Sequence, residues 1–501
     1  MKAAAIFSDN MVLQREKNIA IFGRCEDICH NISVSVPKFS VKSPAIINNG
    51  RWEAILPPMS ACESCTVIIE SEKEQICFKN VAIGEVWVAG GQSNMEFELQ
   101  NDKNAKSALD ECSKEKVRFY YTPKCEMNDA RLIAEEEKSC WSLADRESAK
   151  CWSAVGYYFA KELSRQLGVI VGVIGCNWGG TSASAWMNRS YLEADNRIKS
   201  YIDEYDKITA AKTETEMIAE YDEYTAYHAS WSKKMEKCYS ETPDIKWNEV
   251  LEICGENRYP GPIGCKNPMR PCGLYETMVS RICPYTIAGF IYYQGESDDH
   301  KPDVYYYLMS ALIENWRADW HDDTLPFIFV QLPMFKYTED SDFKNWAKIR
   351  EAQMKVYRTI KNTGIAIALD CGEFNNIHPT NKQPVGHRLY LQAMRHVYGD
   401  NDDMAAFPPM YKNCVVCGNK MKLSFDNCSG FSVVGDSPVD NFEIAGSDGN
   451  FCQATAKING CEIELSSDKI ENPLNARYQW TNYAEVRLFG KNGLPVPPFR
   501  T

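Results

Sequence analysis

Ser93 lies in the stretch 88–97, "VAGGQSNMEF", where a serine hydroxyl could act as a nucleophile. The segment 85–89 before it is short and rich in β-branched and aromatic residues, which predicts a buried strand. A Gly-Gly pair ends this strand, and residues 94–97 favour a first helical turn. A serine between strand and helix is raised above the sheet edge, and its N–H lies where partial positive charge favours an oxyanion. The stretch equally fits an ordinary turn with a serine N-cap.

A nucleophilic serine needs a general base, and His378 is the candidate. It lies in "CGEFNNIHPTNKQPVGHRL", on a loop after a predicted strand at 364–369, and Pro379 stiffens that loop. The acid that would orient the imidazole is less evident, because Asn375, three residues earlier, carries no negative charge. Three candidates stay open for this role: Asp370, Glu373 and a backbone carbonyl such as that of Asn375.

Two further segments could supply donors to an oxyanion. "CNWGGTSASAW" (176–186) contains Gly179 and Gly180, whose backbone N–H groups a tight turn could expose. "YYQGESD" (292–298) places the amide of Gln294 beside a glycine. A side-chain amide together with backbone N–H groups can stabilise a tetrahedral oxyanion.

All four segments follow predicted strands. The strands are expected at 85–89, 117–121, 168–176, 286–293, 326–332 and 364–369, and the helices between them at 153–167, 303–316 and 343–361. Near-continuous apolar runs of this kind are typical of a parallel sheet covered on both faces. The sequence therefore predicts a doubly wound α/β domain, whose sites lie at the carboxyl ends of its strands.

The pattern changes along the chain and predicts three parts. Residues 1–80 alternate short β-rich runs with turn residues, as in a small antiparallel β-domain, and residues 81–400 form the α/β domain. Residues 401–501 return to the β pattern. Within the α/β domain, residues about 190–260 are rich in Glu, Lys and Tyr and predict a solvated helical insertion without a catalytic role.

Composition narrows the class of partner and the compartment. A net charge of −13 and a pI near 5.3 disfavour a nucleic-acid partner, which needs a concentrated basic face. No run of residues predicts a membrane span, and the N-terminal "MKAAAIFSDNMVLQR" is too polar for a signal peptide. We therefore expect a cytoplasmic protein in which most of the 21 cysteines are reduced thiols.

Other chemistries are also compatible with parts of the sequence. The pairs Cys62/Cys65 and Cys414/Cys417 have metal-ligand spacing, but a zinc ribbon would require them to meet across about 350 residues. A glycoside hydrolase could use two carboxylates drawn from Glu96, Glu98, Glu296 and Asp298. A non-catalytic carbohydrate-binding protein would use exposed Trp and Tyr side chains and would lack a reactive serine.

Several long motifs, in this order, resemble the sialate O-acetylesterase family of the SGNH-hydrolase superfamily. They are "FSDNMVLQR", "GEVWVAGGQSNME", "WGGTSASAW", "GLYETMV", "YYQGESD", "IHPTNKQPVGHRL" and "NPLNARYQW…GLPVPPFRT". The resemblance covers nearly the whole chain. It implies a serine esterase that removes O-acetyl groups from sugars without a metal or other cofactor.

The resemblance also implies roles for individual residues. Ser93 resembles the nucleophile, His378 the base, and the Ser93 N–H, Gly180 and Gln294 the oxyanion donors. The sequence departs from the family at Asn375-Asn376, where relatives often have an aspartate, so a Ser–His dyad is an alternative to a triad. The resemblance implies O-acetylated sialic acid as the substrate, with acetylated plant-derived xylo- or manno-oligosaccharides as the alternative. A sialate carboxylate would favour an arginine in the cleft, and Arg270 and Arg350 are the candidates.

Overall fold

A parallel sheet forms the middle of the molecule. The computed structural model describes residues 1–25, 31–243, 245–435 and 439–501. The sheet strands, in spatial order, are β9 (Val117–Tyr121), β11 (Val171–Asn177), β8 (Gln75–Gly91), β12 (Gly289–Tyr293), β13 (Phe327–Gln331) and β14 (Thr363–Ile367). All neighbouring pairs in this set are parallel. The short β10 (Ser142–Leu143) adds an antiparallel edge to β9.

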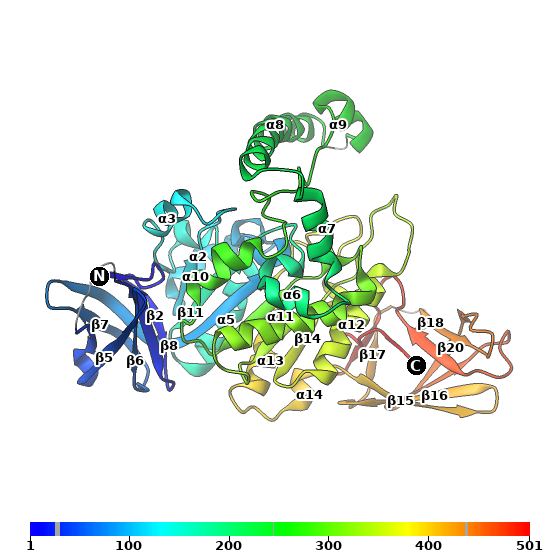
Figure 1. Ribbon diagram of the computed structural model, residues 1–501. Helices are drawn as coiled ribbons and strands as arrows, with labels where there is room; N and C mark the ends of the chain where they lie inside the picture. The colour runs from blue at the N-terminus through cyan, green and yellow to red at the C-terminus, as the bar shows by residue number, and fades with distance from the viewer. Residues whose placement is uncertain (26–30, 244, 436–438) are drawn as a thin grey trace.

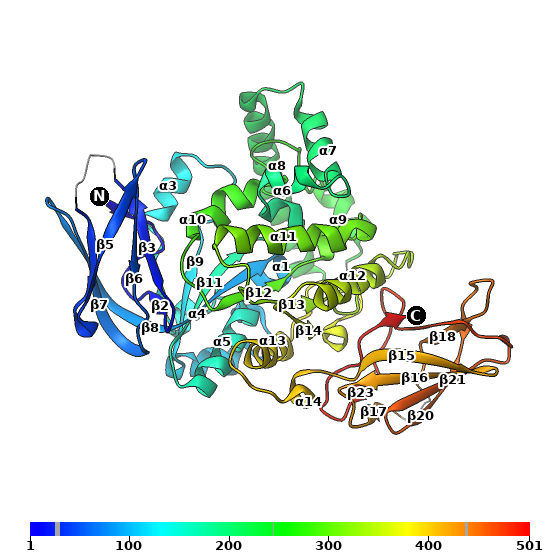
Figure 2. The same cartoon turned by 60° about the horizontal axis from the view of Figure 1, so that its bottom comes forward.

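Helices cover both faces of this sheet. On one face, α5 (Ala154–Leu167) and α13 (Gln383–His396) pack against each other, and on the other lie α11 (Tyr305–Asp319) and α12 (Asn345–Thr359) (Figure 2). The strands β11 to β14 are buried along their whole lengths because both faces are covered. The expected mixed α/β class is confirmed, and the apolar runs that predicted these strands lie within one or a few residues of them.

The N-terminal part is an antiparallel β-structure that shares β8 with the parallel sheet. Its other strands are β1 (Lys2–Ala3), β2 (Val12–Gln14), β3 (Ile19–Arg24), β4 (Ser33–Val36), β5 (Val41–Asn48), β6 (Arg51–Leu56) and β7 (Cys62–Glu70). β7 pairs antiparallel with the first half of β8, and β2 pairs parallel with its middle. The boundary expected at residue 80 therefore lies inside a strand, and a single hydrophobic core extends across it.

The insertion is helical, as its composition indicates. It contains α6 (Arg189–Ala194), α7 (Ser200–Thr209), α8 (Glu214–Glu241) and α9 (Trp247–Cys254). Thr213 and Glu216 form a capping box that starts α8. In Figure 1, α8 and α9 project from the body, and a small core that includes Trp231 and Val250 holds them together. The chain then returns through a π-helical turn, η5 (Tyr275–Val279), and α10 (Ser280–Ile282).

The C-terminal part has its own hydrophobic core and several small antiparallel sheets. Its strands are β15 (Met410–Cys417), β16 (Lys420–Asp426), β17 (Phe431–Val433), β18 (Phe442–Ala445), β19 (Cys452–Gln453), β20 (Thr455–Asn459), β21 (Glu462–Ser466), β22 (Asn475–Tyr478), β23 (Leu488–Gly490) and β24 (Phe499–Arg500). The two β-rich parts lie at opposite ends of the molecule (Figure 1). Cys62/Cys65 in β7 and Cys414/Cys417 in β15 are therefore far apart, and no His/Cys/Asp/Glu group in the described residues is arranged to hold a metal.

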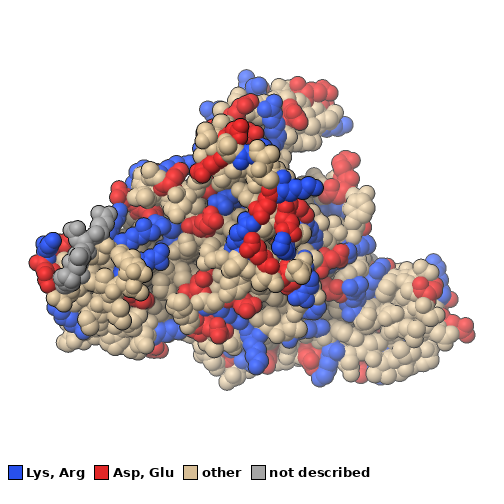
Figure 3. Space-filling model, viewed as in Figure 1, with Lys and Arg blue, Asp and Glu red and all other residues tan. Residues whose placement is uncertain are grey.

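Short helices complete the fold. They are α1 (Ser93–Glu96), α2 (Ala105–Glu111), α3 (Ala130–Glu136), α4 (Arg146–Ala149) and α14 (Asp403–Ala406). No helix in the described part of the chain has the length and apolar character to cross a membrane. On the face in Figure 3, acidic and basic side chains are interspersed over the body and the insertion.

Candidate active site

Ser93 begins α1 directly after β8, at the carboxyl edge of the parallel sheet. Gln92 precedes it in extended conformation and donates its backbone N–H to the carbonyl of Tyr293 on β12. The first N–H groups of a helix have no partner within the helix, so the backbone of this turn offers donors at the sheet edge. The expected order of strand, glycine pair, serine and helical turn is what the structure contains.

His378 contacts Ser93. The two residues are 285 positions apart in the chain, and Nε2 of His378 lies 2.8 Å from Oγ of Ser93. Burial lowers the pKa of the His378 imidazole, the nearby Lys382 ammonium lowers it further, and Glu96 acts in the opposite direction. A lowered pKa keeps the imidazole neutral at neutral pH, which is the state that can accept a proton from a hydroxyl.

Hydrogen bonds within its loop hold His378 in place. Asn375 has φ +62°, and the side chain of Asn376 accepts the backbone N–H of His378 at 3.1 Å. Glu373 accepts hydrogen bonds from Asn376 at 2.8 Å and from the backbone N–H and hydroxyl of Thr380 at 2.7 and 3.0 Å. Glu373 therefore shapes the loop.

Neither carboxylate candidate for an orienting acid is bonded to the imidazole. The Asp370 carboxylate forms a two-point ion pair with Arg388 at 2.5 and 2.9 Å, and Glu373 is occupied by its own loop. Among the described residues, neither one hydrogen-bonds to His378. The carbonyl of Asn375 stays a prediction for this role.

The glycine turn after β11 lies against the nucleophile. A Cβ at Gly179 would lie 3.1 Å from Cβ of Ser93, so a larger residue there would press against the nucleophile. The Gly179 N–H donates to Oε2 of Glu96 at 2.5 Å, and Oε1 of Glu96 pairs with Lys124. Gly180 has φ +74°, in the left-handed region, and the space beside its Cα is filled by the hydroxyl of Tyr259 and by Met269. The insertion, expected to be remote from chemistry, thus borders the site at Tyr259.

Gln294 is not a free oxyanion donor, which corrects the expectation from sequence. Its side chain is 1% exposed, and its Nε2 donates to the carbonyl of Thr181 at 3.2 Å and to Asp298 at 2.6 Å. Its Oε1 accepts the hydroxyl of Tyr305 at 3.0 Å. Because both amide hydrogens are used, Gln294 acts as a brace that ties the glycine turn to the loop after β12.

A buried polar network lies behind Ser93, and the sequence did not predict it. Asn94 donates from Nδ2 to Glu296 at 2.6 Å and to the carbonyl of Ile377 at 3.0 Å, and its Oδ1 accepts Nζ of Lys382 at 2.5 Å. Burial lowers the pKa of Lys382 to about 8, although Glu296 opposes this. Burial also raises the pKa of Glu296. The motifs "QSNM", "YQGE" and "HPTNK" contain these residues, but spacing alone gives no signal that they meet.

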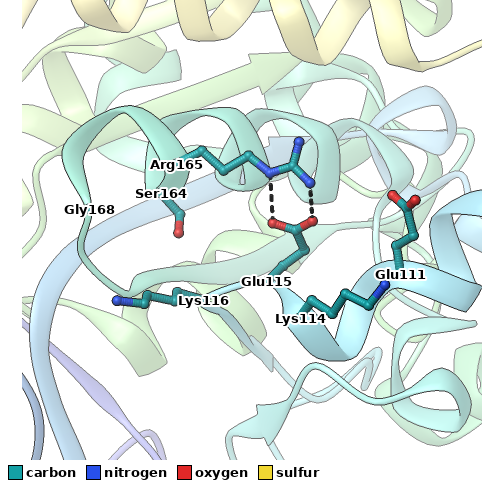
Figure 4. Close-up of a pocket in the computed structure, with 7 residues that line it drawn as sticks. All are labelled: Glu111, Lys114, Glu115, Lys116, Ser164, Arg165 and Gly168. Carbon is teal, nitrogen blue, oxygen red and sulfur yellow. Dashed lines mark hydrogen bonds and ion pairs between the residues drawn. The ribbon is translucent and has the colours of Figure 1, made fainter.

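A separate cavity of about 350 Å³ lies near the opposite, amino-terminal edge of the sheet (Figure 4). Arg165 forms a two-point ion pair with Glu115 there, at 3.0 and 2.5 Å. The nucleophile–base contact lies at the carboxyl edge instead, where an α/β sheet places its sites.

Comparison with known proteins points to one family. The model of the family described as carbohydrate esterase, sialic acid-specific acetylesterase, matches residues 83–243 and 266–395. Sialate O-acetylesterase from Mus musculus is 26% identical over 99% of this chain and 93% of its own length, and that from Homo sapiens is 24% identical over 99% and 91%. The crystal structure of a carbohydrate acetylesterase from Xanthomonas citri has a TM-score of 0.78 and 28% identity, covering 100% of this chain and 99% of that chain.

Proposed function

The chain belongs to the carbohydrate esterase family of sialic acid-specific acetylesterases, and on that premise we propose that it hydrolyses O-acetyl esters of sugars through an acetyl-enzyme on Ser93. It is a carboxylic ester hydrolase by family. The observation that carries the mechanism is the 2.8 Å contact between Ser93 Oγ and His378 Nε2. A nucleophile and base within hydrogen-bond reach are the signature of covalent acyl transfer.

The proposed reaction has two halves. His378 Nε2 takes the Ser93 proton as Oγ attacks the acetyl carbon, and the carbonyl electron pair moves onto oxygen. The intermediate collapses, the bond from acetyl carbon to sugar oxygen breaks, and His378 returns the proton to the leaving sugar hydroxyl. Water then attacks the acetyl-enzyme with the same help from His378, which releases acetate and restores Ser93.

The backbone supplies the proposed oxyanion donors. We assign this role to the N–H groups of Ser93 and Gly180, because the Gly179 N–H donates to Glu96 and the Gln294 amide is occupied. Donors fixed by the backbone need little reorganisation as charge develops on the oxygen. Since Asp370 and Glu373 are engaged elsewhere, the proposed catalytic unit is a Ser–His dyad with the imidazole held by its loop.

The surroundings of the carboxylates disfavour a glycoside hydrolase. Asp298 is fully buried and accepts hydrogen bonds from Ser182, Ala183, Tyr201 and Gln294, which makes it a structural hub. Glu96 is bound to Lys124 and Gly179, and Glu98 accepts from Gln100 at 2.7 Å. A pair of free carboxylates flanking a glycosidic bond is therefore not formed by these residues.

For the finer fold and the compartment we keep the expectations from sequence as proposals. The full-length likeness to the Xanthomonas citri enzyme supports an SGNH-type doubly wound domain with flanking β-domains. Cys238 and Cys254 are thiols whose sulfurs lie 3.9 Å apart without a disulfide between them, which supports the proposed reducing, cytoplasmic location.

Acetate release by the wild type and by Ser93→Ala, measured side by side, tests the function. The substrates are O-acetylated sialic acid, acetylated xylo-oligosaccharides and acetylated manno-oligosaccharides, and Ser107→Ala on α2 is the control. Acetate from the wild type and the control, but not from Ser93→Ala, is the expected result. Equal release from Ser93→Ala and the wild type would remove Ser93 from the mechanism.

A further inference from the structure

A cleft opens beside the Ser93–His378 pair, between the loops that follow β12 and β13. Its volume of about 370 Å³ is within the range of roughly 300–1,000 Å³ found for small-molecule sites. We call it the aromatic cleft, and its border includes Glu296, Asp299, Tyr337, Phe343, Trp346 and Ile377. Ile377 directly precedes His378, and its carbonyl accepts a hydrogen bond from Asn94, the residue after Ser93. The cleft therefore adjoins the reacting pair.

Exposed aromatic rings form one wall of the aromatic cleft. Phe343 is 73% exposed and Tyr337 is 43% exposed. Phe335 packs against two rings of this wall. Its ring centroid lies 4.7 Å from that of Tyr337 and 4.8 Å from that of Trp346. Such rings on the border of a cavity mark a ligand surface, and their flat faces complement the C–H face of a pyranose.

Carboxyl groups also border the aromatic cleft. Glu296 is buried there, with Oε1 held by Asn94 at 2.6 Å. Asp299, also on the border, is only half-buried and can accept a hydrogen bond from a hydroxyl group. The aromatic cleft thus combines stacking rings with an acceptor for a sugar hydroxyl.

Charge in the aromatic cleft does not match an anionic sugar. Among the described residues on its border, the carboxyl groups of Glu296, Asp299 and Asp340 face one ammonium group, that of Lys336. Like charges brought together on binding cost affinity.

The two arginines that sequence suggested for a sialate carboxylate are engaged elsewhere. Arg350 is fully buried and donates to the carbonyls of Pro333 and Thr481. Arg270 pairs with Glu276 at 2.5 Å and also donates to the carbonyl of Cys265. Neither guanidinium is available for the bidentate contact that recognises a carboxylate.

The C-terminal part of the chain stiffens the aromatic cleft. Asn482 accepts the backbone N–H of Trp346 at 3.1 Å and that of Phe335 at 3.0 Å, and Asp342 accepts that of Asn482 at 3.2 Å. Figure 1 shows the segment between β13 and α12 as a loop on the side of the body that faces the C-terminal part. A wall fixed before binding lowers the entropy lost when a ligand docks.

We infer that the aromatic cleft binds a pyranose of an uncharged acetylated saccharide, with the ring stacked on Phe343 and Tyr337 and a hydroxyl on Asp299. This rests on the proposed esterase function and names its substrate class. It selects neutral acetylated oligosaccharides over acetylated sialic acid.

Variants of the exposed rings test the binding role. Phe343→Ala and Tyr337→Ala are compared with Tyr239→Ala, another exposed aromatic, on α8, using p-nitrophenyl acetate and acetylated xylo- and manno-oligosaccharides. The cleft variants should lose about tenfold in kcat/KM on the oligosaccharides, mainly through KM, and less than about twofold on p-nitrophenyl acetate. Equal effects on both substrate types, or no effect on the oligosaccharides, would overturn the inference.

The substrate preference of the wild-type enzyme tests whether the acidic border of the aromatic cleft disfavours an anionic sugar. We expect higher kcat/KM on the neutral oligosaccharides than on O-acetylated sialic acid. A preference for the sialate, lost in Lys336→Gln, would overturn the inference and leave the esterase function intact. If p-nitrophenyl acetate hydrolysis did not depend on Ser93, the proposed function itself would fail, which is a separate result.

Discussion

Nζ of Lys382 donates a hydrogen bond to Oδ1 of Asn94 at 2.5 Å, and both side chains are buried directly behind the nucleophile. Asn94 follows Ser93 in the chain, and Lys382 lies four residues after His378. This hydrogen bond, like that from Asn94 to the carbonyl of Ile377, therefore joins the serine turn to the histidine loop. The ammonium group also places positive charge close to the imidazole, which links the network to the protonation of His378.

The acid limb of the pH profile should have its midpoint below 6.5. His378 must be neutral to act as a base, so activity falls as pH drops through its pKa, and burial and Lys382 both lower that pKa. Removing the charge in Lys382→Met should move the midpoint to higher pH, whereas Lys336→Gln, the control, should not move it. kcat/KM for p-nitrophenyl acetate from pH 4 to 8 measures this. A wild-type midpoint at or above 6.5 would contradict the lowered pKa.

Loss of either member of the reacting pair should be severe. Ser93→Ala and His378→Ala should each lower kcat by about 10⁴-fold or more, and the double variant should lose little beyond this because the two residues act as a unit. Thermal unfolding of each variant checks that the fold is intact. Independent, multiplicative losses in the double variant would show that the two side chains do not share one step.

Gln294→Ala should lower both the unfolding free energy of the protein and its kcat. The substitution leaves the Thr181 carbonyl and the Asp298 carboxylate short of a donor in a buried site, which costs about 1–3 kcal/mol of unfolding free energy. Urea unfolding and kcat are measured together, with the exposed Gln100→Ala as control. A fall of 10²–10³-fold in kcat with unchanged stability would instead identify Gln294 as an oxyanion donor.

Gly180→Ala should lower kcat/KM about 100-fold. A Cβ there is strained by the positive φ and collides with the hydroxyl of Tyr259, so the backbone N–H must move from the oxyanion position. Adding Tyr259→Ala should restore part of the loss because it opens that space. Gly168→Ala is the matched control, since it has φ +71° and nothing within 4 Å, and it should affect stability alone. No recovery in the double variant would exclude the collision with Tyr259.

Sequence patterns predicted local structure well where one local feature, such as an apolar run or a capping residue, determines the element. The run at 117–121 coincides with β9, and the predicted helix at 153–167 differs from α5 by one residue, because Ser153 caps it and Gly168 ends it. Ser93 and His378 were identified because each follows a strand of the same parallel sheet. Strand order then brings their loops together.

Contacts between distant buried polar groups could not be predicted in this way. Lys382 and Asn94 are 288 residues apart, and neither residue type signals a partner. The amide of Gln294 was recognised as a donor, but its hydrogens are taken by Asp298 and Thr181, which only the three-dimensional arrangement reveals. β8 was divided at residue 80 because it alternates exposed and half-buried side chains in its first six residues and is wholly buried thereafter.

The continuity of β8 has a consequence for unfolding. Its 17 residues, about 55 Å if fully extended, run from the antiparallel N-terminal part to the glycines before Ser93. Asn80 has φ +53° where the pairing with β7 is irregular, but the strand stays hydrogen-bonded on both sides of this point. Because one hydrophobic core also crosses it, the N-terminal part and the catalytic sheet should melt in one transition.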